Sequence, residues 1–324
     1  MIQLRQSLLL LIGMCGSVML HAQNPLNFGS NIKTADPSAH VWADGRIYLY
    51  TSHDEECQPD FYMKDWHVFS SEDLVSWKDH GAVLSVKDLQ WADNYAWAPD
   101  CALKDGQYYF CFPAGTGMKD RVNPEKSNKW MGIGIAVSDN PTGPFKDHIG
   151  KPLWTEPYAN DPCLFIDDDG TPYLYVHGSG ADYRVIKMSD DMKSTKGDFI
   201  KMDMGGYEPK MEGPWVFKRN NKYYFTMPEN NKVLTYYMSD SPTGPWQYKG
   251  EIMGDEHNSN NHHSIVQFKG QWLLFYHRWI DTGKDCDNRE RQRKVCAEYL
   301  YFNEDGTIQP VKRTAEGLSV PPRQ

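Results

Sequence analysis

Three acidic residues and one tryptophan hold the same position in a repeated sequence unit. Each lies at the same offset before the tight turn of its own unit, and the four residues are Asp36, Trp97, Asp161 and Glu212. Units that repeat in sequence adopt the same local fold, so equivalent residues should occupy equivalent points in space. In a fifth unit the offset reaches Asn261, with His262 one place later.

Three carboxyl groups placed close together destabilise a folded protein. Such a cluster therefore indicates a catalytic role. Mutual repulsion and desolvation raise the pKa of at least one such group, which leaves a protonated acid beside an ionised base near neutral pH. Hydrolysis of a glycosidic bond needs that pair: an acid for the leaving oxygen and a base for the attacking water. A single Asp-Pro is more often a turn or a cap. The shared offset in three units favours the catalytic interpretation.

The elements that position these residues are five β-hairpins. Their turns are Asp44-Gly45, Asp105-Gly106, Asp169-Gly170, Asn220-Asn221 and Lys269-Gly270, each followed by a strand rich in aromatic residues. Such pairs supply the positive φ that tight hairpins require. The units repeat every 50 to 60 residues or so without long helical periodicity, which is typical of propeller blades. The sequence therefore predicts an all-β, five-bladed β-propeller, one domain over residues 23–324, whose first strands line a central axis.

The motifs around these positions resemble glycoside hydrolase family 43 over nearly the whole chain after the N-terminal segment. They are Ala35-Asp36-Pro37-Ser38, Trp97-Ala98-Pro99, Asn160-Asp161-Pro162, Glu212-Gly213-Pro214 and Asn261-His262-His263-Ser264. The resemblance implies a five-bladed propeller and an inverting hydrolase. It also implies that Asp36 is the general base, Glu212 the general acid, and Asp161 the residue that orients the acid and tunes its pKa.

Four further residues are candidates for binding. His262 resembles the family's axial histidine, which implies either a calcium ion held largely through waters or a structural hydrogen-bond network. Trp97 and Trp215 could form a pocket wall against a sugar, with core packing as the alternative for Trp215. Arg278 could donate paired hydrogen bonds to substrate hydroxyls, or close a blade through an ion pair. No other cofactor is expected.

The basic cluster Arg289, Arg291, Arg293 and Lys294 is interpreted as a solvated hairpin face, because charge runs are usually exposed. The net charge of −9 and the lack of a basic stripe argue against nucleic acid as a partner. Six cysteines follow the N-terminal segment without metal-ligand spacing. Pairing of Cys101 with Cys111, or of Cys286 with Cys296, is conceivable, but buried free thiols are favoured.

Residues 1–22 are interpreted as an export signal. Arg5 precedes an apolar run from Leu8 to Leu20, and Ala22 before Gln23 is a plausible cleavage point. The run is too short to span a membrane. We therefore expect a periplasmic or extracellular protein; Cys15 suggests a lipoprotein instead, but Met14 before it disfavours that processing.

The leading hypothesis is an exo-acting inverting hydrolase that removes a terminal pentose, α-L-arabinofuranose first, from arabinan, arabinoxylan or arabinogalactan. The choice of a pentose rests on the resemblance. The alternatives are a β-xylosidase of the same fold and a non-catalytic carbohydrate-binding propeller. Loss of one of the three acids would favour the binding module, and none is missing.

Overall fold

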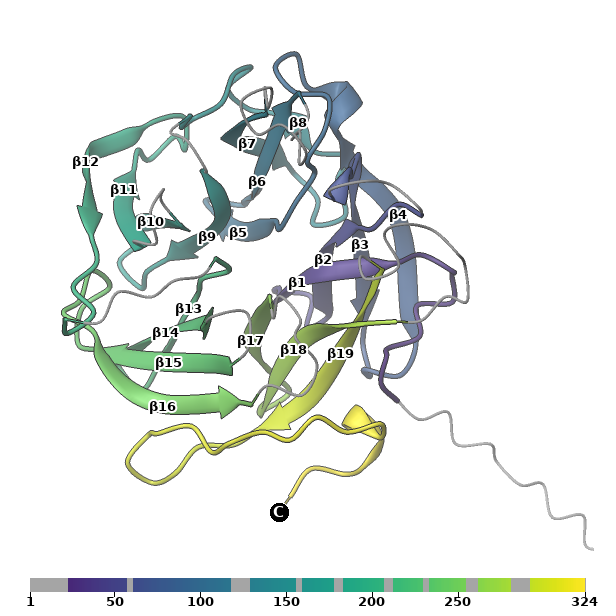
Figure 1. Ribbon diagram of the computed structural model, residues 1–324, viewed down its shortest axis with the longest axis vertical. Helices are drawn as coiled ribbons and strands as arrows, with labels where there is room; N and C mark the ends of the chain where they lie inside the picture. The colour runs from purple at the N-terminus through teal and green to yellow at the C-terminus, as the bar shows by residue number, and fades with distance from the viewer. Residues whose placement is uncertain are drawn as a thin grey trace, which may run out of the picture.

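The computed structural model describes residues 23–56, 61–117, 129–155, 159–177, 183–206, 212–229, 233–254, 262–280 and 292–323. Five antiparallel sheets surround a central axis (Figure 1), and no α-helix occurs in these ranges. The first sheet contains β1 (Thr34–Val41), β2 (Ile47–His53), β3 (Asp65–Ser71) and β4 (Trp77–Ser85). The second contains β5 (Asp100–Lys104), β6 (Gln107–Thr116), β7 (Trp130–Ser138) and β8 (Lys146–Asp147).

The remaining three sheets continue the ring. The third contains β9 (Asn160–Ile166), β10 (Pro172–His177), β11 (Tyr183–Met188) and β12 (Thr195–Lys201). The fourth contains β13 (Trp215–Arg219), β14 (Lys222–Glu229), β15 (Val233–Ser239) and β16 (Gln247–Met253). The fifth has three strands, β17 (His263–Phe268), β18 (Gln271–Trp279) and β19 (Arg293–Leu300). The predicted all-β, five-bladed propeller is confirmed.

The predicted turns are present where the first two strands of each blade meet. Asn220 and Asn221 form a two-residue connection between β13 and β14 with φ values of 50° and 60°. Asparagine tolerates this left-handed conformation better than most residues, and two such residues in succession are typical of the turn whose twist matches antiparallel strands. The tight turn fixes the register of the hairpin, and therefore which side chains face the neighbouring blade.

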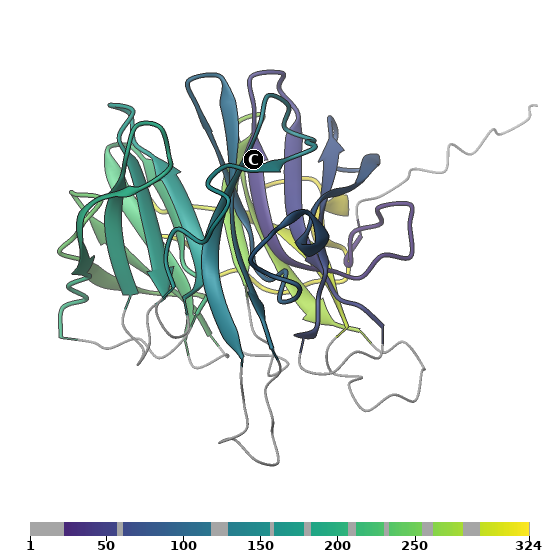
Figure 2. The same ribbon diagram turned by 90° about the horizontal axis from the view of Figure 1, so that it is seen from above.

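Aromatic and aliphatic side chains fill the spaces between neighbouring blades. One cluster joins the first and second blades around Tyr50, Trp66 and Phe110, all fully buried. Similar clusters join each of the other pairs of neighbouring blades. Figure 2 shows the sheets standing side by side when the molecule is turned. The innermost strands β1, β5, β9, β13 and β17 contact one another around the axis, as predicted.

The N-terminal segment covers the outer edge of the three-stranded fifth blade. The Leu26 N–H donates to the Val295 carbonyl oxygen at 2.8 Å, and the Asn24 side chain bonds both backbone groups of Ala297. A short 3-10 turn, Gly317–Ser319, packs against β19 as well. These contacts join the two ends of the described chain to one blade, and they cover a strand edge that would otherwise have unpaired backbone groups.

The favoured interpretation of the cysteines holds for four of them. Cys101, Cys111, Cys163 and Cys296 are buried free thiols. Cys57 and Cys286 lie outside the described residues, as does the proposed export signal. The described chain has no helix with the length and apolar character needed to cross a membrane.

Candidate active site

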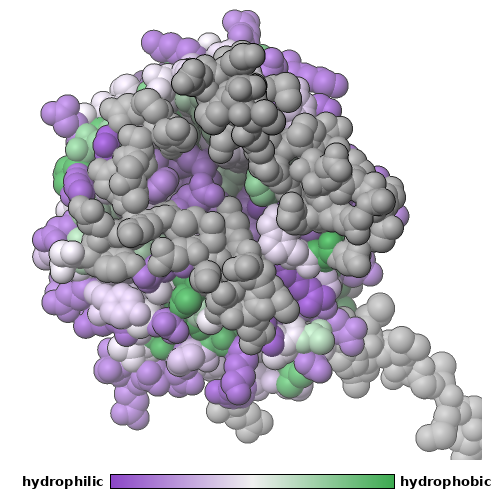
Figure 3. All heavy atoms as spheres, in the orientation of Figure 1, coloured by the Kyte–Doolittle hydropathy of each residue, from purple (hydrophilic) through white to green (hydrophobic). Residues whose placement is uncertain are grey.

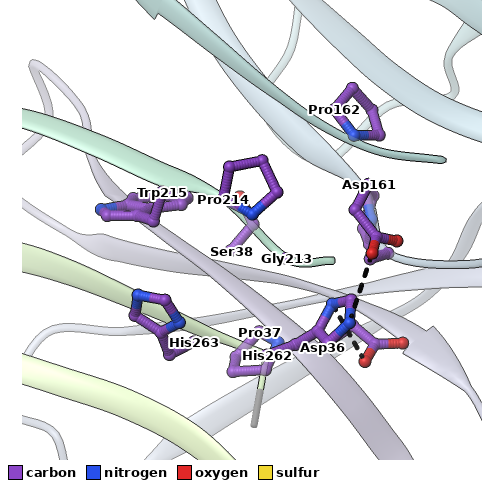
Figure 4. A pocket seen from close by; sticks show the side chains of 12 residues that line it. Asp36, Pro37, Ser38, Asp161, Pro162, Gly213, Pro214, Trp215, His262 and His263 are labelled. Atoms are coloured by element: carbon purple, nitrogen blue, oxygen red, sulfur yellow. Dashed lines mark ion pairs between the residues drawn. The ribbon is translucent and has the colours of Figure 1, made fainter. Parts of the chain in front are cut away.

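The innermost strands bring the predicted residues together at one end of the axis. Asp36 lies in β1 and Asp161 in β9, while Glu212 lies just before β13 and His262 just before β17. One carboxylate oxygen each of Asp161 and Glu212 and one nitrogen of His262 lie within 4.8 Å of one another. Figure 4 shows His262 between Asp161 and Asp36, with an ion pair to each. The repeat offset thus marks residues that converge in space.

Asp36 and Asp161 share an unusual local backbone. Each precedes a proline and has a positive φ, 51° for Asp36 and 47° for Asp161. The register with the second strand shifts at both places, between Ala35 and Ser38 in β1 and beside Asp161 in β9. Such bulges redirect a side chain, and a positive φ in a non-glycine residue costs about 1–3 kcal/mol. The same strain in two blades indicates that the fold maintains this orientation.

The Asp36 carboxylate is held by cationic and hydroxyl groups. Ser52 donates a hydrogen bond of 2.5 Å to Oδ2, and Arg293 donates one of 2.9 Å to Oδ1. His277 accepts the Asp36 backbone N–H through Nδ1 at 3.0 Å. Burial would raise the pKa of Asp36, but the charges of Arg293 and His262 and the hydrogen bond from Ser52 outweigh it and hold that pKa well below its ordinary value. Asp36 is therefore ionised at neutral pH.

Arg293 links Asp36 to a second buried carboxylate. Its Nε and Nη2 donate to Asp54 at 3.0 and 2.8 Å, and its backbone N–H donates to Asp54 at 2.8 Å. Burial raises the pKa of Asp54, and Arg293 opposes that effect. The interpretation of Arg293 as part of a solvated face was wrong, since only 2% of its surface is exposed. A guanidinium can be buried here because two carboxylates compensate its charge.

Asp161 has a different environment from Asp36. Burial, together with the nearby charges of Glu212 and Asp36, raises the pKa of Asp161 well above its ordinary value. The Gly213 N–H donates a hydrogen bond to this carboxyl group, which opposes the shift only in part. The neighbouring Asn160 donates from Nδ2 to Glu212 Oε2 at 2.9 Å. Two consecutive residues of β9 therefore interact with Glu212: Asn160 through a hydrogen bond and Asp161 through electrostatic repulsion.

These groups line a small pocket at this end of the axis. Its lining includes Asp36, Asp161, His262 and Trp215, together with the prolines that follow the acids. Figure 3, in the same orientation as Figure 1, shows a hollow among the blades with hydrophilic residues visible inside it. Buried carboxyl groups with opposite pKa shifts, gathered in an axial pocket, form a site suited to acid–base hydrolysis.

Comparison with known proteins agrees with this geometry. Residues 23–308 match the family model described as glycosyl hydrolases family 43. The chain belongs to this family. Its relatives include a xylosidase/arabinosidase from Humicola insolens, 34% identical over 86% of this chain and 97% of the relative. The predictions of a family 43 member and of a glycoside hydrolase are confirmed.

Solved structures also resemble this family 43 enzyme. One is a β-xylosidase/α-arabinofuranosidase from a compost microbial metagenome, in complex with xylotriose and in calcium-free form, with a TM-score of 0.75 and 34% identity. The match covers 90% of this chain and 97% of the chain in that structure. Another is an α-L-arabinofuranosidase from Clostridium thermocellum, with a TM-score of 0.69, 37% identity and the same coverage of both chains.

The two tryptophans predicted for binding have distinct surroundings in this family 43 enzyme. Trp215 is buried, lines the axial pocket and donates from Nε1 to the Ile265 carbonyl oxygen at 3.0 Å. Trp97 is partly buried, and the Lys129 ammonium lies 3.8 Å from its ring centroid. Trp215 therefore contributes to both the core and the pocket, while a role for Trp97 in binding stays a prediction.

The arginine beside the acids is Arg293, and the predicted role of Arg278 in binding substrate hydroxyls stays a prediction. Arg278 Nη2 lies 3.4 Å from the Asn24 carbonyl oxygen, whereas Arg293 contacts Asp36. Sequence reasoning missed Arg293, Asp54 and Asn160. Asn160 could have been predicted from the sequence because it adjoins Asp161. The other two carry no such signal, since their contact joins residues 239 positions apart.

Proposed function

We propose that this family 43 enzyme removes a terminal pentose from plant polysaccharides with inversion at the anomeric carbon. The observation that carries the proposal is the convergence of Asp36, Asp161 and Glu212 at one end of the axis, with Asp36 held by Arg293 and Ser52 and Glu212 held by Asn160. Acid–base hydrolysis needs an ionised base and a protonated acid at the same pH. The proposed base is Asp36 and the proposed acid is Glu212.

In this mechanism Asp36 accepts a proton from the water that attacks the anomeric carbon. Arg293 and Ser52 hold its carboxylate in one orientation, so the base is positioned before substrate binds. Glu212 donates its proton to the glycosidic oxygen as the bond to the leaving group breaks. Asn160 fixes one Glu212 oxygen, and a carboxylate oxygen of Asp161 lies within 4.8 Å of one of Glu212. Asp161 is thus proposed as the orienting residue and pKa modulator.

For the sugar, we propose α-L-arabinofuranose first and β-D-xylose second. The names of the relatives support both, because they include a β-xylosidase/α-arabinofuranosidase bound to xylotriose and an α-L-arabinofuranosidase. Arabinan, arabinoxylan and arabinogalactan are the proposed polymers. The pattern of residues 1–22 supports export to the periplasm or the exterior as part of the proposal.

A calcium ion on the axis is compatible with His262. His262 Nε2 and Asp161 Oδ2 are buried 3.4 Å apart, and neither has a hydrogen-bond partner among the described residues. Calcium prefers six to eight oxygen ligands, so waters would supply most of them around these two residues. Such an ion would compensate part of the negative charge that the three acids concentrate here. The calcium-free form of one relative supports testing for it.

The proposal is tested by hydrolysis of nitrophenyl α-L-arabinofuranoside and β-D-xyloside. We expect wild type to release nitrophenol from at least one of them. Glu212→Gln should lose most of its activity on natural oligosaccharides, whose leaving groups need protonation, and less of its activity on the nitrophenyl glycosides. Glu251→Gln, an exposed acid on β16, is the matched control and should behave as wild type. NMR of the first sugar formed should show inverted anomeric configuration. Retention would contradict the mechanism, and sugar binding without turnover would favour the non-catalytic alternative.

A further inference from the structure

Two histidines and an aspartate form a second cluster of potential metal ligands, on β2 and β3 of the first blade. His53 ends β2, and Asp65 and His67 lie at the start of β3. The register pairs Thr51 with His67 and Ser52 with Trp66, which brings His53 opposite Asp65. Residues two apart on a strand share a face, and so do directly opposed residues. The three side chains therefore project from the same face of the blade.

The distances within this cluster are those of a compact ligand set. His53 Nδ1 lies 2.8 Å from Asp65 Oδ1, and His67 Nε2 lies 3.3 Å from the same oxygen. One ligand atom from each residue can be chosen so that all three lie within 4.8 Å of one another. A metal ion bound at about 2.0–2.2 Å from each atom requires only a small outward movement of the side chains.

The partial exposure of the cluster allows an ion to enter. The exposed fractions of the side chains are 26% for His53, 27% for Asp65 and 13% for His67. The three residues are thus held in place by the strands but are open to water on one side. Three protein ligands with water in the remaining position is a common arrangement for zinc.

We propose that His53, Asp65 and His67 bind a divalent first-row transition metal, with Zn²⁺ as the first candidate. Two imidazole nitrogens and one carboxylate suit zinc, nickel, copper or cobalt, whereas calcium and magnesium prefer sets made of oxygen. The cluster presents two ring nitrogens to a single carboxylate oxygen, an arrangement that a cation between them stabilises.

An ion here would stiffen the strand end that holds the proposed base. Ser52, which donates to Asp36, and Asp54, which holds Arg293, are the residues on either side of His53. Metal binding should therefore raise the melting temperature, because the ion binds the folded state and not the separated ligands of the unfolded chain. The proposal does not depend on the sugar or the stereochemistry of the reaction.

The test is titration of the metal-free protein with Co²⁺, followed by visible absorption, and with Zn²⁺, followed by calorimetry. We expect one ion per chain at this cluster and a higher melting temperature in wild type. Asp65→Asn and His53→Asn should each weaken binding at least about tenfold, since even loss of outer ligand partners costs that much. We choose His53 and Asp65 for these changes because both side chains are more exposed than His67, so folding is less affected.

Two controls separate this cluster from other histidines. His148→Asn changes a histidine that contacts the Asp191 carbonyl oxygen elsewhere and should bind as wild type. His262→Asn removes the axial histidine and should keep the Co²⁺ spectrum. Binding that survives His53→Asn and Asp65→Asn but is lost in His262→Asn would overturn the proposal, as would a wild-type protein that takes up neither ion.

Discussion

At the scale of single residues, Asp36 and Asp161 show how neighbours decide the behaviour of a carboxyl group. Both precede proline, both have a positive φ and both are nearly fully buried. The contribution of burial raises the pKa of both residues, yet the net shift is downward for Asp36 and upward for Asp161. The difference arises because Arg293 compensates Asp36, whereas Asp161 faces the negative charge of Glu212.

Asp161→Asn should therefore stabilise the protein while reducing its activity. The raised pKa of Asp161 means that its ionised form opposes folding, so an amide removes a penalty at neutral pH, about 0.5–2 kcal/mol. The gain should shrink as pH falls through the ordinary carboxyl pKa, since below it Asp161 is protonated in both the folded and the unfolded states. Urea unfolding at several pH values, together with kcat, measures both effects.

Asp36→Asn is the matched comparison, and we expect it to lower the free energy of unfolding rather than raise it. The lowered pKa of Asp36 contributes stability above the ordinary carboxyl pKa, and this contribution is lost as pH falls. The variant should be less stable than wild type at neutral pH and approach it in acid. Equal changes in stability for the two variants would contradict the assigned environments.

Gly213→Ala should lower activity through His262. Gly213 has a φ of +81°, and a Cβ there would lie 3.3 Å from ring atoms of His262. The left-handed backbone costs a non-glycine residue about 1–2 kcal/mol, and the contact should also displace the imidazole. Gly170→Ala is the control, because its φ is +82° but its Cβ would contact nothing within 4 Å. Melting temperatures should fall in both variants, and kcat only in Gly213→Ala. Loss of activity in both would point to backbone strain alone.

At the scale of elements, β2 and β19 together hold the proposed base that β1 carries. Ser52 in β2 and Arg293 in β19 donate to the two oxygens of Asp36, and Asp54 after β2 holds Arg293. The first and fifth blades are thus joined through a buried charge network directly beneath the site. Its geometry depends on both strands keeping their register.

Arg293→Met should destabilise the fold and shift the pH dependence of catalysis. Removing the guanidinium leaves two buried carboxylates uncompensated, which costs about 3–5 kcal/mol. The pKa of Asp36 should rise, because burial is then opposed by the histidines and Ser52 without Arg293. The acidic limb of kcat/KM, which requires ionised Asp36, should move to higher pH. A pH–rate profile and a urea titration measure the two changes.

Arg278→Met is the control for that experiment. Arg278 lies on β18, next to β19, and its guanidinium lies near the Asn24 carbonyl oxygen. We expect an unchanged acidic limb in this variant. If KM also rises while the pH profile stays unchanged, the result would support the prediction that Arg278 binds substrate hydroxyls.

At the scale of the whole molecule, closure of the ring depends on both ends of the described chain contacting the fifth blade. Asn24 Nδ2 donates to the Ala297 carbonyl oxygen, the Glu298 carboxylate and the Thr314 carbonyl oxygen, and its Oδ1 accepts from the Ala297 N–H. One buried side chain therefore joins the N-terminal segment, β19 and the C-terminal segment.

Asn24→Ala should lower stability by about 1–3 kcal/mol, because buried backbone groups of Ala297 lose their partner. We expect a lower melting temperature with little change in kcat at temperatures where the variant stays folded. Asn27→Ala, which removes an exposed contact to the Gly29 N–H, is the control. A melting temperature equal to wild type in Asn24→Ala would show that the side chain does not contribute to closure.

The hairpin turns and the shared offset made the propeller and the meeting of Asp36, Asp161 and Glu212 predictable, and the family resemblance added His262. Both signals are local: a turn depends on φ preferences of neighbouring residues, and a repeat makes equivalent positions comparable without any structure. The spacing of the cysteines favoured buried free thiols, which the four described cysteines are.

The network behind the acids was decided only by the tertiary structure. Arg293 belongs to a basic run that is indistinguishable in sequence from a solvated face, and it is buried because closing the ring brings β19 against β1 and β2. The opposite pKa shifts of Asp36 and Asp161 depend on that contact too. The acidic residues on the axis could be identified from the sequence, because a repeat is detectable from the local spacing of residues. Their charge states required the folded ring, because electrostatic interactions depend on distance in space and on burial.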